Sequence, residues 1–194
     1  GKLLLPGFND AHVHFVDGGL ALDRVPLNDA TSAEEFARRV GERAKQTPKG
    51  EWVTGGDWDE TKWTPSVMPT KELIDPLTPD TPVFVGRYDG HMALANSVTL
   101  RLAGITAQTP DPPGGVIVRD AQGNPTGAMN DSTMHYVHNL APPLSTESRV
   151  PAAKRAMATC TTPGLTSLPA LTPDQGLRTL PPDWPGRGRP RCRH

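Results

Sequence analysis

The residues whose types and spacing best suit chemistry are Asp10, His12 and His14. Residues two apart on a β-strand point to the same face, so these three side chains are expected to lie together. Two neutral imidazoles on one strand face can bind a single divalent metal ion. Asp10 would then either orient an imidazole or act as a further ligand. The competing interpretation is a half-exposed strand that carries two surface histidines.

The strand that would carry these histidines is expected over residues 3–15, with a kink at Pro6. An apolar run at its start gives way to alternating polar and apolar residues, which is typical of a strand. A helix should follow over residues 32–45, because Ser32 and Glu35 have the spacing of a capping box.

Hydrophobic patterning and turn residues predict the other elements. Strands are expected at residues 52–54, 82–86, 116–119, 126–129 and 164–168, and helices at residues 70–74, 93–103 and 145–160. The third and fourth of these strands flank a polar turn and should form a hairpin. Strands that alternate with helices place the chain in the α/β class.

The patterned sequence ends at Leu168. Residues 169–194 are rich in proline and arginine and show no hydrophobic periodicity, so we expect a disordered tail without stable packing. The expected organisation is therefore a folded part over residues 1–168, followed by this tail. The arginines at its end are a weak signal for nucleic-acid binding, because no aromatic residues are interleaved with them.

Composition excludes several classes of protein. The 194-residue chain has 20 basic and 21 acidic residues and a net charge of −1, which gives no electrostatic footprint for nucleic acid or an anionic membrane. No apolar run approaches the roughly 18 residues of a membrane span, and the N-terminal run is too short for a signal peptide. The two cysteines form neither a disulfide framework nor a zinc motif. We therefore expect a cytoplasmic protein without nucleic-acid or membrane partners.

Residues 5–14, with the sequence LPGFNDAHVH, resemble the first barrel strand of the metal-dependent amidohydrolase superfamily. Further motifs follow in the order typical of the amidohydrolase family 3 branch, which includes N-substituted formamide deformylase. These motifs lie at residues 55–59, 69–71, 82–84, 89–97, 102–106, 111–115 and 125–127. The resemblance covers residues 1–168.

The resemblance implies a (β/α)8 TIM barrel of the metal-dependent hydrolase type, of which this chain would form a truncated part. Residues 1–168 would be a partial barrel domain with an inserted α+β segment. A complete barrel takes about 250 residues, so the later strands would lie outside this chain. The resemblance leaves a homo-oligomer open for the full-length family.

The implied activity is hydrolysis of a non-peptide carbon–nitrogen bond, of amide or formamide type, in a small-molecule substrate. One or two divalent metal ions, expected to be zinc, would lower the pKa of a bound water and polarise the scissile carbonyl. The alternative is a catalytically inactive product of truncation or frameshift, because no catalytic proton acceptor can be assigned in this chain. Under that alternative the chain alone would bind zinc weakly and would hydrolyse amides at a rate near that of the uncatalysed reaction.

The resemblance also assigns roles to individual residues. His12, His14 and Asp131 are the candidate metal ligands, and a helix N-cap is the alternative role for Asp131. His91 follows a strand, where a barrel places its active-site loops, and is a candidate for holding the substrate carbonyl or the leaving group. Trp58 would either line the substrate pocket or belong to the core.

Overall fold

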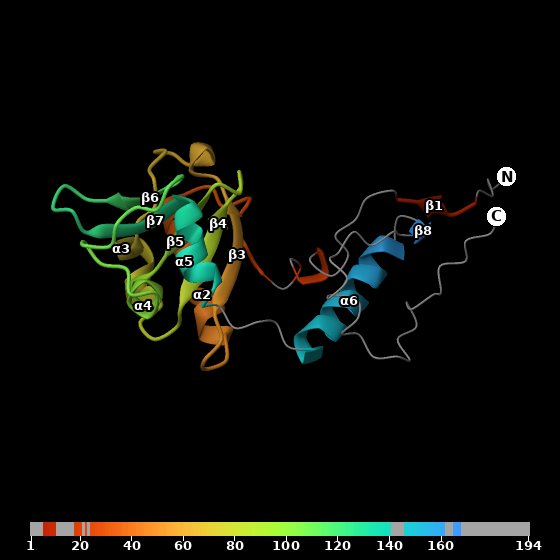
Figure 1. Cartoon of the computed structure of the whole chain (residues 1–194). Coiled ribbons are helices and arrows are strands. Elements are labelled where there is room, and N and C mark those ends of the chain that lie inside the picture. Colours follow the sequence, from red (N-terminus) through yellow and green to blue (C-terminus); the bar gives the residue numbers. More distant parts are fainter. Residues whose placement is uncertain are drawn as a thin grey trace. The chain divides into compact units, whose positions relative to one another are not determined.

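The computed structural model describes residues 6–10, 18–20, 22, 24–140, 146–161 and 165–167 (Figure 1). Arg24–Pro142 forms one compact unit, called the large unit below. The described residues of Gly1–Asp23 and Pro143–His194 belong to a second, small unit. No helix in the described part of the chain is long and apolar enough to span a bilayer.

The large unit is built on a six-stranded mixed sheet with the strand order β2-β3-β4-β5-β7-β6. β2, β3 and β4 pair in parallel, whereas β4–β5, β5–β7 and β7–β6 pair antiparallel. The strands are β2 (Val25–Pro26), β3 (Val53–Trp58), β4 (Val83–Arg87), β5 (Met92–Ala95), β6 (Gly115–Arg119) and β7 (Pro125–Asp131). The described residues thus form a mixed α/β structure, and they do not form a closed barrel.

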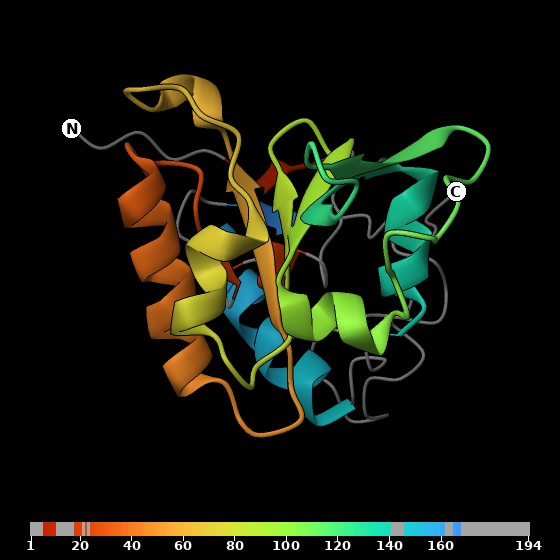
Figure 2. The same cartoon turned by 90° about the vertical axis from the view of Figure 1, so that its left-hand side faces the viewer.

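Helices accompany the sheet on both faces, and α2 runs alongside β3 in Figure 2. The helices and 3-10 turns of the large unit are α2 (Ala33–Gln46), η1 (Glu60–Lys62), α3 (Lys71–Ile74), η2 (Asp75–Leu77), α4 (Ser97–Leu102), η3 (Ser132–Met134) and α5 (His135–His138). Val83 and Val85 pack in the core cluster that contains α2, whereas Phe84 packs in the cluster that contains α4 and α5. This alternation is the period of two that a strand requires when both of its faces are covered.

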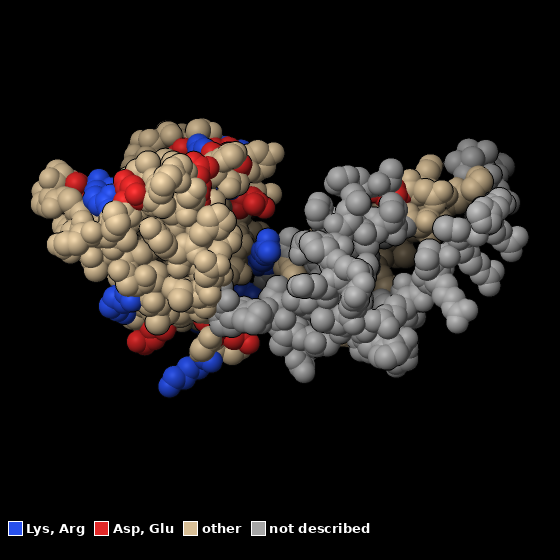
Figure 3. All heavy atoms as spheres, viewed as in Figure 1, with Lys and Arg blue, Asp and Glu red and all other residues tan. Residues whose placement is uncertain are grey.

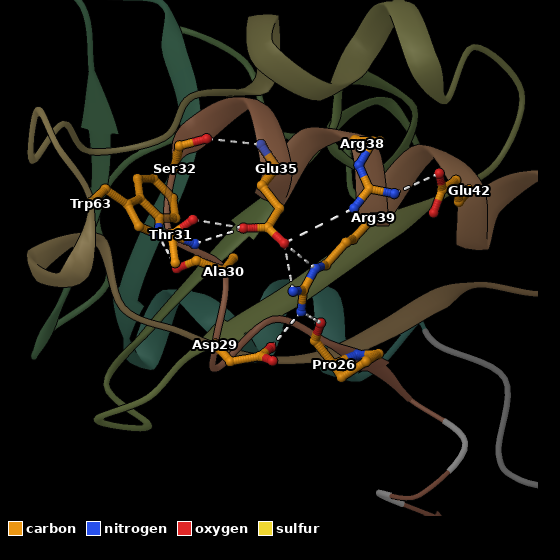
Figure 4. Close-up of polar contacts among 10 residues, drawn as sticks. All are labelled: Pro26, Asp29, Ala30, Thr31, Ser32, Glu35, Arg38, Arg39, Glu42 and Trp63. Atoms are coloured by element: carbon orange, nitrogen blue, oxygen red, sulfur yellow. Dashed lines mark hydrogen bonds and ion pairs between the residues drawn. The ribbon is translucent and has the colours of Figure 1, made fainter.

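The first helix of the large unit confirms the prediction from its capping box. The Ser32 hydroxyl accepts a hydrogen bond from the backbone N–H of Glu35 at 3.1 Å (Figure 4). The Glu35 carboxylate reaches back to the backbone N–H of Thr31 at 2.9 Å. That backbone hydrogen bond, with those from Arg39 and the Thr31 hydroxyl, lowers the pKa of Glu35 to about 2. Local signals therefore fix where α2 begins.

The segment predicted as one helix over residues 93–103 is instead a strand followed by a short helix. β5 occupies Met92–Ala95, and α4 begins after Asn96, whose side chain accepts from the backbone N–H of Thr99 at 3.0 Å. The last three residues of β5 are buried and pair with β4 and β7. The ladder hydrogen bonds and burial between two neighbouring strands outweigh the helix propensity of alanine and leucine.

The other predictions of secondary structure within the described residues are confirmed, with shifted ends. The strands predicted at residues 52–54 and 82–86 are β3 and β4, and the predicted hairpin is formed by β6 and β7. α3 begins after Thr70 as predicted, although the Thr70 side chain makes no capping hydrogen bond.

The described residues of the small unit include a two-stranded parallel sheet and the helix α6. β1 (Phe8–Asn9) pairs with β8 (Leu165–Ser167), and α6 (Thr146–Thr161) immediately precedes β8 in the chain. The predicted helix over 145–160 and strand over 164–168 are therefore confirmed. The predicted strand over 3–15 is confirmed only at β1, because most of its residues lie outside the described ones. The predicted tail over 169–194 also lies outside them.

Candidate active site

The topology of the large unit brings His91 and Asp131 together, although 40 residues separate them in the sequence. β4 and β7 both pair antiparallel with β5, so they run in the same direction and end at the same edge of the sheet. His91 directly precedes β5 and Asp131 ends β7. The backbone N–H of Asp131 donates to the carbonyl of His91 at 3.0 Å, which extends the ladder to these residues.

The two side chains form a hydrogen-bonded pair. Nδ1 of His91 lies 2.8 Å from Oδ1 of Asp131, and the side chains are 77% and 48% exposed. The hydrogen bond to Asp131 and its negative charge raise the pKa of His91. A carboxylate that engages one ring nitrogen fixes the tautomer and leaves the other nitrogen for a ligand. The pair can therefore hold a proton or a hydrogen-bonded ligand at a solvent-accessible edge.

The backbone of Asp131 adopts a conformation that non-glycine residues seldom occupy. Its φ angle is +47°, within the region that favours glycine. Such a residue costs about 1–3 kcal/mol and persists only where its surroundings enforce it. Asp131 stands at the N-cap position of η3, but its side chain makes no capping hydrogen bond. Its carboxylate is directed to His91 and not to the helix end that was the alternative in the sequence analysis.

A network of charged residues behind this pair fixes the turn that carries His91. The Arg87 guanidinium donates to both oxygens of Glu60, at 2.9 and 2.7 Å. Arg87 also pairs with Asp89, whose other oxygen accepts from the backbone N–H of His91 at 3.0 Å. Glu60 is only 7% exposed. The hydrogen bonds from Arg87 lower the pKa of Glu60 despite its burial, so both partners are charged.

Sequence reasoning did not single out this network. The signal that could have found its exposed part is the alternation of Arg87, Asp89 and His91 directly after a buried strand. Residues at the carboxyl end of a strand are the usual place for ligand contacts in α/β proteins. Glu60 carries no comparable signal, because its burial depends on a strand 27 residues away.

Trp58 is completely buried in the structure. Its indole N–H donates to the carbonyl of Val85 at 3.2 Å, and its ring packs edge-on against Phe36 with 6.0 Å between centroids. The Trp58 ring therefore has the core role that the sequence analysis held as one of two possibilities. It offers no surface to a substrate in this structure.

The predicted metal ligands His12 and His14 lie outside the described residues. Asp10 follows β1, and its backbone N–H donates to the carbonyl of Ser167 at 3.1 Å. No group of three or more His, Cys, Asp or Glu side chains in the described part of the chain is arranged to hold a metal ion. The described residues alone therefore do not complete a metal centre.

We expect Asp131→Asn to lower the pKa of His91 toward its ordinary value of 6.5, because the substitution removes the main cause of the shift. The protonated imidazole would lose its anionic partner, so the ring would give up its proton at lower pH. The measurement is the pH titration of the His91 ring by NMR. Asp111→Asn, at a carboxylate that pairs with Arg119, is the matched control. An unchanged His91 titration in Asp131→Asn would show that the pair does not form in solution.

Comparison with known proteins identifies the family to which the chain belongs. A model described as the amidohydrolase family matches residues 1–185. The chain belongs to the amidohydrolase family. It is 38% identical over 167 residues to the protein named amidohydrolase YtcJ from Bacillus subtilis (strain 168), covering 86% of this chain and 31% of that protein. It is 33% identical over 143 residues to N-substituted formamide deformylase from Arthrobacter pascens, covering 73% of this chain and 26% of the enzyme.

A solved structure also resembles this chain. An uncharacterized metal-dependent hydrolase from Pyrococcus horikoshii OT3 matches with a TM-score of 0.64 and 26% identity, over 90% of this chain and 32% of the other. This amidohydrolase chain thus spans about a third of the length of the relatives it matches. The family match continues to residue 185, past Leu168, where the sequence analysis ended the resemblance. The comparisons therefore do not favour an inactive product with an unrelated end.

Proposed function

We propose that the protein containing this chain is a metal-dependent hydrolase of non-peptide carbon–nitrogen bonds, of amide or formamide type. The observation that carries the proposal is the family match over residues 1–185, which includes the Asp10-x-His12-x-His14 pattern. The likeness to a formamide deformylase supports the bond type, and the likeness to a metal-dependent hydrolase supports the metal.

The metal we propose is zinc, with His12 and His14 as ligands and Asp10 orienting an imidazole; Asp131, in the large unit, is proposed separately as a metal ligand. A zinc ion bound there would lower the pKa of a water molecule and polarise the scissile carbonyl. One oxygen of Asp131, Oδ1, is engaged by His91, which leaves Oδ2 for this role. The surrounding fold we propose is a (β/α)8 barrel, of which β1 and β8 would be neighbouring strands. β1 and β8 pair in parallel, and α6 directly precedes β8 in the chain, which is the strand–helix–strand order that such a barrel repeats.

His91 is proposed to hold the substrate carbonyl or the leaving group. Its Nδ1 is engaged by Asp131, which orients the ring and leaves the other ring nitrogen to contact the substrate. Its high exposure leaves it accessible to a small molecule. The substrate we expect is a small amide or formamide in the cytoplasm, with no nucleic-acid or membrane partner.

The test of this function is hydrolysis of a panel of N-substituted formamides and simple amides by the zinc-loaded protein. We expect turnover with at least one member of the panel, and its loss in His12→Ala and in His14→Ala. His91→Ala should lower kcat/KM by about 10–100-fold without abolishing zinc binding, in the range of a lost hydrogen bond to a charged group. Turnover that survives both histidine substitutions would contradict the proposal.

A further inference from the structure

A groove on the large unit carries an unusual number of arginine side chains. It lies between β2 and α2, has a volume of about 330 Å³, and is lined by Arg24, Arg38, Arg39 and Arg43, with Glu42 beside them. On the face of the large unit seen in Figure 3, basic and acidic side chains are interspersed. A groove lined by four arginines and one glutamate therefore differs from the mixed charge of that face, and the proposed hydrolysis does not use it.

Arg39 forms a fixed part of this groove (Figure 4). Its guanidinium donates to the backbone carbonyl of Pro26 at 3.0 Å and to the Glu35 carboxylate at 2.6 Å, and it pairs with Asp29. These partners join α2 to the chain that follows β2 and hold the Arg39 side chain in one position. The carboxylates of Glu35 and Asp29 balance much of the positive charge of Arg39. Arg39 therefore contributes to the shape of the groove more than to its positive charge.

Arg38 also has a partner of its own. It pairs with Glu42 at 2.7 Å, one turn along the exposed face of α2. An exposed pair of this kind contributes little and rearranges readily, because water screens both charges. Arg38 can therefore turn toward an anion in the groove at small cost.

In the part of the chain that the structure describes, the remaining two arginines have no such partner. Arg24 and Arg43 line the same groove, and within the described residues neither forms an ion pair or a side-chain hydrogen bond. Arg24 lies directly against Gly55, since its Cβ is 2.4 Å from where a Cβ on Gly55 would stand. Gly55 has a φ of +116°, so this close approach is built on a backbone that requires glycine. Within the described residues, the groove thus holds two arginines without an acidic partner, one of them packed against a glycine that the backbone requires.

We propose that this groove binds a phosphate group, either as inorganic phosphate or as the phosphate monoester of a small molecule. Two uncompensated guanidinium groups match the charge of about −2 that a phosphate monoester carries near pH 7. Arginine binds phosphate oxygens through two parallel hydrogen bonds. A carboxylate has only two oxygens, so it could accept such a pair of hydrogen bonds from only one of the two arginines. The volume is at the lower end of small-molecule sites, which range over about 300–1,000 Å³, and suits a phosphate with a small organic group.

The test is a calorimetric titration of the full chain with inorganic phosphate at constant ionic strength. Arg24→Gln/Arg43→Gln should weaken phosphate binding by at least about tenfold, as expected when hydrogen bonds to a charged ligand are lost. Arg101→Gln, on the exposed face of α4, is the matched control and should change the affinity less than about twofold. Because neither Arg24 nor Arg43 has a side-chain partner among the described residues, the thermal unfolding of the double variant should match that of the wild type.

A parallel titration with glycerol phosphate separates the two sources of the phosphate group. Tighter binding of glycerol phosphate than of inorganic phosphate assigns the groove to a monoester, and the reverse order assigns it to the free ion. Three results would overturn the proposal: equal phosphate affinity in the double variant, acetate binding as tightly as phosphate, or single-stranded DNA binding through these arginines while phosphate does not bind.

Discussion

Asn96→Ala is expected to destabilise the protein by about 3–5 kcal/mol, because it removes a fully buried amide that is completely hydrogen-bonded. The Asn96 carbonyl oxygen accepts from the backbone N–H groups of Val83 and Thr99, at 3.1 and 3.0 Å. Its amide nitrogen donates to the carbonyl of Thr81 at 2.9 Å and to the carbonyl and hydroxyl of Thr78 at 3.2 and 2.9 Å. One side chain thus joins the start of β4, the start of α4 and the loop between η2 and β4.

The substitution leaves the donors of Val83 and Thr99 without partners in the interior. Each unsatisfied buried group costs about 1–3 kcal/mol, which exceeds the value of the hydrogen bonds themselves. Urea unfolding followed by circular dichroism measures the change. Asn139→Ala, at an exposed asparagine after α5, is the control and should shift the free energy of unfolding by less than about 0.5 kcal/mol. Equal effects for the two substitutions would contradict the packing described for Asn96.

Arg87→Met is the second substitution with a large expected effect. It leaves the Glu60 carboxylate without Arg87, its bidentate partner, although the Glu60 side chain is only 9% exposed. Removing one partner of a buried pair costs about 3–5 kcal/mol in general, and the partial exposure of Arg87 reduces this to about 2–4 kcal/mol. The substitution also releases Asp89, so the turn that positions His91 should lose its fixed conformation.

The destabilisation caused by Arg87→Met should depend on pH in a defined direction. Arg87 lowers the pKa of Glu60, so the pair contributes stability above the ordinary pKa of 4.5 and loses it as the pH falls through the lowered value. The difference in unfolding free energy between wild type and Arg87→Met should therefore be largest at neutral pH and narrow in acid. The double variant Glu60→Leu/Arg87→Met should be less destabilised than the sum of the single variants. A cost that is independent of pH, or one matched by Arg101→Met, would contradict a buried charged pair.

The elements that the sequence predicted well are those specified by local signals. α2 is one case, because the Ser32 and Glu35 side chains make their capping contacts within one turn of the chain. The β6–β7 hairpin is another, since Asp120 organises its own turn by accepting from the backbone of Gln122 and Asn124. Neither feature depends on what the rest of the molecule does.

What the sequence could not predict depends on partners far away in the chain. Residues 92–95 form a strand because β4 and β7 flank them, and a short apolar run does not distinguish a strand from a helix by its period. His91 and Asp131 were each identified as candidates, but their pairing follows from the register of β5 on β7. Glu60 was missed because charged residues are seldom buried, and its partner Arg87 is contributed by β4, 27 residues away.

The measurement that tests the central claim most directly is the zinc content and zinc affinity of the protein after chelation and reloading. The account predicts at least one bound zinc ion per chain, with affinity reduced by at least about tenfold in His12→Ala and in His14→Ala, because each removes a ligand. His135→Ala, at an exposed histidine of α5, should leave both quantities unchanged. Zinc content and affinity that are the same in all four proteins would contradict the assignment of His12 and His14 as metal ligands.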